Sequence, residues 1–147
     1  GSDVVLRHDA SVGAGASIGD GCVLKAGADA GATSQVGVGV TLERNATLDD
    51  RVQVGAGCEI GRGSVIESGA VVEGKCVLGP RCVVGAEAQL AEGCVLDKRV
   101  SVGAKATLGA GVRVGAGAQI GAGAIVEAGA VIARMAVVPE GARVSAE

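Results

Sequence analysis

The sequence predicts an all-β solenoid, a three-sided column of short parallel strands, and two columns of inward residues and the cysteine spacing predict it. An aliphatic residue occupies 23 of the 24 positions whose number is divisible by six, from Leu6 to Val144, with Ala30 as the exception. The positions two places earlier hold only Ala, Ser, Cys or Val. A period of six suits neither a helix nor an amphipathic strand. A fixed short period over the whole chain indicates a repeat architecture.

Each six-residue unit predicts one flat side followed by one corner. A small inward residue, an outward residue and an aliphatic inward residue make a three-residue strand, as in Ala118-Gln119-Ile120. Glycine fills 12 of the positions just after the aliphatic residue and 13 of those three after it. Because glycine adopts backbone conformations closed to other residues, these positions are suited to tight turns.

The cysteines predict three sides per coil. Cys22, Cys58, Cys76 and Cys94 are separated by 36, 18 and 18 residues, so 18 residues bring the chain back to the same side. The chain then makes about eight coils, and at one strand spacing per coil the column is about 40 Å tall. The phase never slips, so the sequence predicts no inserted loops.

The pattern of aliphatic, Gly, any, any, small, any resembles the hexapeptide-repeat family, whose fold is the left-handed parallel β-helix. The resemblance covers essentially the whole chain and implies a triangular prism with left-handed crossovers. General rules for parallel strands favour right-handed crossovers, so the hand comes from the resemblance alone. The family includes acyltransferases, γ-class carbonic anhydrases and the C-terminal domains of sugar nucleotidyltransferases.

Composition narrows the setting. Residues 3–147 read as one solenoid domain, and Gly1-Ser2 resembles a cloning scar. No apolar run approaches the length of a membrane span, and a net charge of −3 gives no general reason to bind nucleic acid or membrane. All five cysteines fall on the small inward position, which predicts buried free thiols, a reducing compartment and hence a cytoplasmic location.

The residues indicate no catalytic, cofactor-binding or metal site. Family acyltransferases commonly use a histidine as general base, but the single histidine, His8, falls on a corner of the first coil between Arg7 and Asp9. The γ-class carbonic anhydrases need three histidines on zinc. The repeated Gly-X-Gly strings are corner glycines and not phosphate-binding loops. We therefore predict no enzyme; were it one, it would be acyltransferase-like.

Charge is sorted by corner. The corners that follow Leu6, Val12 and Ile18 are called the first, second and third corner of each coil. The first corner collects eight of the 13 basic residues and three carboxylates, whereas the other two corners are acidic. This predicts a possible association edge that meets an acidic edge of a neighbouring copy, formed by Arg44, Arg62, Arg81, Lys98 and Arg99. A solvated rim and a rail for an anionic polymer are the alternatives.

The leading functional hypothesis is a non-catalytic structural scaffold, an engineered or idealised hexapeptide-repeat domain whose partner is itself. Lateral trimers, which the resemblance implies, and end-to-end stacking are both compatible with the sequence. Outward valines, Val65 with Val83 and Val77 with Val95, could contribute to an interface. The alternative is an acyltransferase-like protein or a sugar-nucleotidyltransferase C-terminal domain that acts as a trimer, with sites between subunits.

Overall fold

The structure is a computed structural model that describes residues 4–146, so the proposed cloning scar at Gly1-Ser2 lies outside the described residues. Strands of two residues recur every six residues and form three parallel sheets. Sheet A contains β1 (Val5–Leu6), β4 (Val23–Leu24), β7 (Thr41–Leu42), β10 (Glu59–Ile60), β13 (Val77–Leu78), β16 (Val95–Leu96), β19 (Arg113–Val114) and β22 (Val131–Ile132). Sheet B contains β2 (Ser11–Val12), β5 (Asp29–Ala30), β8 (Thr47–Leu48), β11 (Val65–Ile66), β14 (Val83–Val84), β17 (Ser101–Val102), β20 (Gln119–Ile120) and β23 (Val137–Val138). Sheet C contains β3 (Ser17–Ile18), β6 (Gln35–Val36), β9 (Gln53–Val54), β12 (Val71–Val72), β15 (Gln89–Leu90), β18 (Thr107–Leu108), β21 (Ile125–Val126) and β24 (Arg143–Val144).

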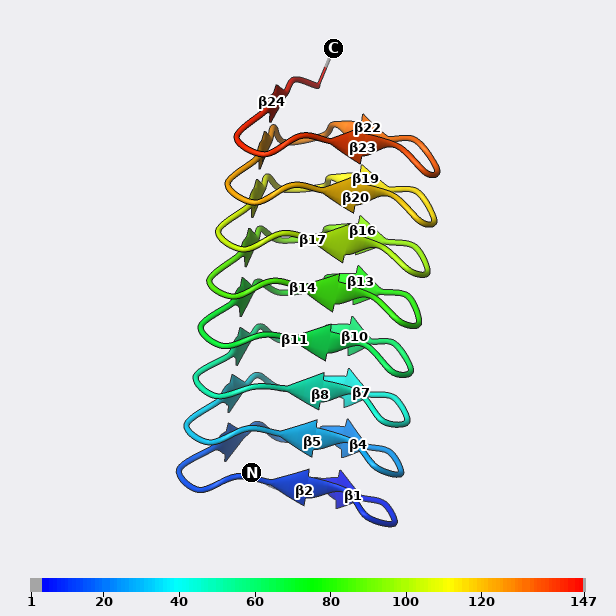
Figure 1. Ribbon diagram of the computed structural model, residues 1–147. Helices are drawn as coiled ribbons and strands as arrows, with labels where there is room; N and C mark the ends of the chain where they lie inside the picture. The colour runs from blue at the N-terminus through cyan, green and yellow to red at the C-terminus, as the bar shows by residue number, and fades with distance from the viewer. Residues whose placement is uncertain (1–3, 147) are drawn as a thin grey trace.

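Each strand pairs with the strand three places along the chain, in a constant register. Leu6 lies beside Leu24, and Val126 lies beside Val144. The chain therefore returns to the same sheet every 18 residues, and it does so for eight coils, which we number 1 to 8 from the N-terminus. Figure 1 shows the coils rising with a left-handed turn. The predicted three-sided solenoid without inserted loops is confirmed.

The strands are two residues long and not three, because the small inward residue contributes only its carbonyl to the ladder. Val23 donates its N–H to the carbonyl of Val40 at 3.0 Å, and Lys25 donates to the carbonyl of Leu42 at 2.9 Å. Repeated around every coil, these bonds satisfy the backbone polar groups along the axis of the column.

Aliphatic and small inward side chains fill the centre of the column. From Cys22 to Val138 the inward positions form one continuous buried core, and Ala30 is fully buried despite its small size. The first coil departs from the prediction that every aliphatic inward residue is buried: Leu6 is 52% exposed and Val12 37% exposed. Inward residues of a solenoid are covered by the coils above and below, and coil 1 has a described coil on one side only.

Among the described residues, no helix has the length and apolar character needed to cross a membrane.

Candidate functional site

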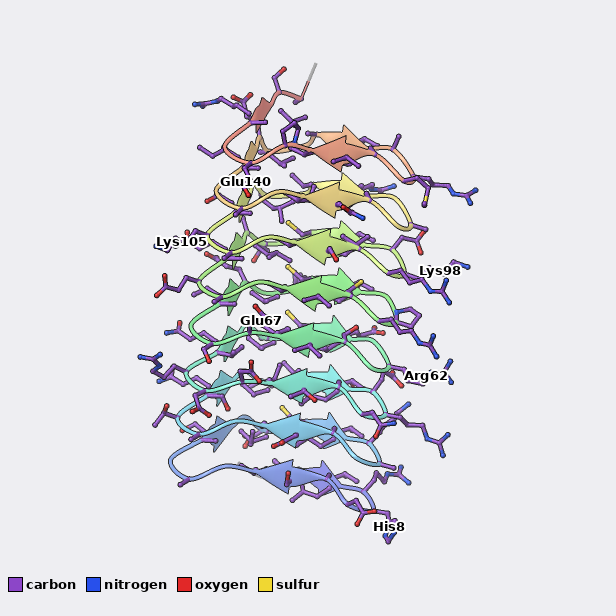
Figure 2. All side chains as sticks on the ribbon, in the orientation of Figure 1. His8, Arg62, Glu67, Lys98, Lys105 and Glu140 are labelled. Atoms are coloured by element: carbon purple, nitrogen blue, oxygen red, sulfur yellow. The ribbon has the colours of Figure 1, made fainter. Side chains whose placement is uncertain are left out.

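The basic edge is the set Arg44, Arg62, Arg81, Lys98 and Arg99, and it runs along the first corner. These residues follow β7, β10, β13 and β16 of sheet A, so consecutive coils 3 to 6 each contribute at least one cation. Figure 2 shows Arg62 and Lys98 projecting from the same rim of the column, with His8 at its lower end. The structure thus brings together, along one line, all five residues of the predicted association edge.

Backbone hydrogen bonds between corners fix the spacing of this edge. Gly63 donates its N–H to the carbonyl of Arg44 at 2.9 Å, and Arg81 donates to the carbonyl of Arg62 at 2.8 Å. Arg99 donates to the carbonyl of Pro80 at 3.0 Å. Successive cations are therefore anchored one strand spacing apart, about 4.8 Å.

The turn geometry places two of the arginines in a strained conformation. Arg81 and Arg99 occupy the second turn position with φ values of 61° and 60°, where Gly63 occupies the same position in coil 4. A side chain in the left-handed region costs roughly 1 kcal/mol. Replacing either arginine by glycine therefore removes a charge from the edge and relieves backbone strain at once.

The carboxylates on the first corner are already engaged. Glu43 forms an ion pair with Lys25 at 3.0 Å. One side-chain oxygen of Asp97 accepts the N–H of Lys98 at 2.7 Å. The ion pairs within residues 4–146 leave out every member of the basic edge, and they are His8–Asp9, Lys25–Glu43, Lys105–Glu87 and Arg143–Glu127. The five side chains of the edge are exposed to solvent.

His8 lies at the end of the basic edge and in contact with solvent. Its side chain is 88% exposed, and its Nε2 atom is 3.4 Å from a carboxylate oxygen of Asp9. The two residues border a shallow hollow whose other wall includes Arg44, Arg62 and Arg81. In the described part of the chain no three His, Cys, Asp or Glu side chains are grouped as a metal site would require.

The second corner carries carboxylates on coils 3, 4 and 5. The acidic edge is the set Asp50, Glu67 and Glu87, which follow β8, β11 and β14 of sheet B. Asp49 lies beside it, where partial burial raises the pKa of its carboxyl group and the charges of Glu67, Asp50 and Asp29 raise it further. These carboxylates repel one another, and only Glu87 has a basic side chain near it, Lys105 at 4.0 Å.

The raised pKa of Asp49 makes a prediction about stability and pH. The folded state holds the Asp49 proton more tightly than the unfolded state does, so this group stabilises the fold at low pH and that stabilisation is lost as pH rises through the folded pKa. Asp49→Asn should therefore raise the melting temperature at neutral pH and narrow the difference between neutral and mildly acidic solution. Thermal unfolding followed by circular dichroism measures both, with Glu92→Gln on the third corner as the control. A lower melting temperature for Asp49→Asn at neutral pH would contradict the prediction.

The five thiols form hydrogen bonds inside the column that the sequence did not predict. All are free and buried, as predicted. Each Sγ donates to the backbone carbonyl of the corner residue fifteen positions later, at 2.9 to 3.2 Å, and the donors are Cys22, Cys58, Cys76, Cys82 and Cys94. Ser64 makes the same contact, with its Oγ donating to the carbonyl of Gly79 at 2.8 Å. Polar hydrogen on the small inward position thus satisfies a corner carbonyl, which alanine in that position cannot do.

The pKa values of these thiols keep them protonated. The hydrogen bond with Cys76 raises the pKa of Cys58, and burial raises it further. The pKa of Cys76 is about 11, because a hydrogen bond with Cys58 lowers it while one with Cys94 and burial raise it. Burial also raises the pKa of Cys82. A thiol that stays protonated at neutral pH is a poor nucleophile, so these three are structural.

The thiol contacts predict a difference between two substitutions at Cys76. Cys76→Ala removes the donor and should lower the free energy of unfolding by about 1–2 kcal/mol. Cys76→Ser keeps a donor in the position that Ser64 occupies elsewhere, so its loss should be smaller. Urea unfolding of both variants measures the difference. Equal losses would mean that the volume of the sulfur, and not its hydrogen bond, provides the stabilisation.

Comparisons with known proteins agree with the fold. The family model described as bacterial transferase hexapeptide (six repeats) matches residues 39–74 and 99–134, and the model described as hexapeptide repeat of succinyl-transferase matches residues 3–28. Together they cover more than half of the chain. No curated protein sequence matches it.

Solved structures with similar folds include three UDP-N-acetylglucosamine acyltransferases. The protein from Campylobacter jejuni is 16% identical with a TM-score of 0.70, and the match covers 93% of this chain and 68% of that one. The protein from Moraxella catarrhalis is 16% identical with a TM-score of 0.62, covering 88% and 65%. The protein from Francisella novicida is 18% identical with a TM-score of 0.62, covering 90% and 62%. The chain spans about two thirds of the length of these proteins, and likeness at this identity shows the shared fold.

Proposed function

This chain belongs to the hexapeptide-repeat family, and from that premise we propose that it is the β-helix body of an acyltransferase-like protein that works as an assembly of side-by-side copies. The observation that carries the proposal is the transferase-type repeat itself, which two hexapeptide models match from the first coil to the last third of the chain. The acyltransferases that share the fold support the same reading.

In this proposal the column is a rigid support, and acyl donor and acceptor bind between neighbouring copies. Eight coils joined by continuous hydrogen bonds keep surface side chains at fixed heights. Such fixed positions are what a site built between two subunits requires, because positioning of two reactants supplies much of the rate enhancement of group transfer. His8 is not assigned as the general base, since its side chain is 88% exposed and its nearest charged contact is Asp9.

The test is binding and turnover of acetyl-CoA by the purified chain. Isothermal titration with acetyl-CoA should give saturable binding, and release of the CoA thiol should speed up when UDP-N-acetylglucosamine is offered as acceptor. His8→Ala should leave both unchanged. Failure to bind acetyl-CoA under conditions in which the chain is assembled would overturn the proposal.

A second candidate function, a structural solenoid without catalysis, is favoured by the regularity of the column. Every repeat from Val4 to Val144 keeps its length of six, so each corner in residues 4–146 is a short turn and no segment folds over the outside of a coil. The same titration separates the candidates, because this one expects assembly without binding of acetyl-CoA.

A further inference from the structure

The basic and acidic edges lie at matching heights on the column. Coil 3 carries Arg44 on its first corner and Asp50 on its second, and coil 4 carries Arg62 and Glu67. Coil 5 carries Arg81 and Glu87. In three consecutive coils, one edge thus presents a cation at the level at which the other presents a carboxylate.

The two edges flank the same face of the molecule. Sheet B connects the first corner to the second, and in Figures 1 and 2 it is the front face, with Arg62 at one rim and Lys105 at the other. Over coils 3 to 6 the outward residues of sheet B are uncharged: Thr47, Val65, Val83 and Ser101. Turning this face away from water therefore desolvates no charge on these coils.

We propose that the basic edge of one copy pairs with the acidic edge of a second copy of this chain, side by side and coil for coil, with sheet B turned inward. Arg44, Arg62 and Arg81 then face the partner's Asp50, the partner's Glu67 and the partner's Glu87. The contact is directional, since the two edges differ, and directional contacts close into rings when the rotation allows. A three-sided column that joins its neighbours through the two corners of one side closes after three copies.

The charges within a single copy leave both edges available for this contact. The arginines of the basic edge have no ion pair within residues 4–146, and the carboxylates on their own corner are occupied by Lys25 and by the backbone of Lys98. Guanidinium groups match carboxylates in geometry, so each arginine can form a two-point contact across the interface. The inference rests on the self-association in the proposed function and not on acyl transfer.

Coil 6 is the exception to the matching and provides a sharp control. Its first corner carries Lys98 and Arg99, but its second corner carries Lys105, whose side chain is 76% exposed. Coil-for-coil pairing places these like charges together. A contact shifted by one coil would avoid this, because Lys98 and Arg99 would face the partner's Glu87, but repetition of that shift builds a filament and not a ring.

The test is sedimentation velocity of the full chain and four variants at low and high salt. The wild type should sediment as a trimer at low salt and dissociate as salt rises. Arg62→Glu and Glu67→Arg should each weaken association about tenfold or more, since each replaces an attraction by a repulsion. The double variant with both changes should regain association, because the swapped charges again face each other. Lys105→Glu should strengthen the trimer.

A control and three outcomes make the result decisive. Glu92→Arg on the third corner changes charge as much as Glu67→Arg does and should leave association unchanged. A monomer at all salt concentrations would overturn the proposal, as would a double variant no better than either single one. Growing polymers unaffected by Lys105→Glu would show the shifted contact instead. Capture of the monomer by a linear polyanion such as heparin, lost in Arg62→Glu, would assign the basic edge to an anionic polymer. If acetyl-CoA fails to bind the trimer, only the proposed acyl transfer falls.

Discussion

Replacing Leu90 by alanine should lower the free energy of unfolding by about 3 kcal/mol or more. Leu90 is fully buried on β15, where it lies between Val72 and Leu108 in the inward column of sheet C. Its removal leaves a cavity that regular neighbours on both sides cannot fill, because their backbones are held in register by the ladder. Urea unfolding followed by far-ultraviolet circular dichroism measures the loss.

The matched control is the adjacent outward residue. Gln89 is exposed on the same strand, so Gln89→Ala should change stability by less than about 0.5 kcal/mol. Similar losses for the two variants would mean that the core of the column does not distinguish inward from outward positions, which would contradict the fold.

Replacing Gly103 by alanine should cost about 2–3 kcal/mol, for a reason specific to stacked coils. A methyl group at Gly103 would lie 2.7 Å from the carbonyl carbon of Gly121 and 2.8 Å from the Cα atom of Ala122, which belong to the coil above. Those atoms are backbone, so they cannot rotate away, and the two coils must move apart locally. Melting temperature and urea midpoint both report the change.

Gly123 provides the comparison, because it has backbone strain without crowding. Its φ value is 69° and no atom lies within 4 Å of an added methyl group. Gly123→Ala should therefore lose only about 1 kcal/mol. Equal losses at the two positions would show that the main chain yields at Gly103, as it does where Asp49 and Glu67 hold the equivalent position in coils 3 and 4.

The sequence predicts nearly all of the fold because the fold is periodic. The column of aliphatic residues from Leu6 to Val144 and the cysteine spacing determine the strands, the corners and the coil length. Two features escape this reasoning. The hand depends on how the chain turns at each corner, which residue type alone does not reveal, and exposure of Leu6 follows from position in the stack and not from its own repeat.

The candidate site is predicted in part. Counting by corner finds the basic edge, and numbering the coils as well would align Arg62 with Glu67, so that signal was present in the sequence. The thiol contacts could not be predicted, because they join Cys58 to the carbonyl of Glu73, on another corner. Only the direction of the side chain in three dimensions shows that a corner carbonyl lies within its reach.

The constant 18-residue register ties the length of this protein to its orientation. Removing one whole coil would leave Arg62, Glu67 and every remaining strand on its own sheet, and the molecule would simply be shorter. Removing one six-residue repeat would instead rotate everything beyond the cut onto the next side, and each charged edge would be split between two corners. The column is therefore free to change size only in units that keep its faces continuous, much as a spiral stair keeps its landings aligned only when whole turns are added or taken away.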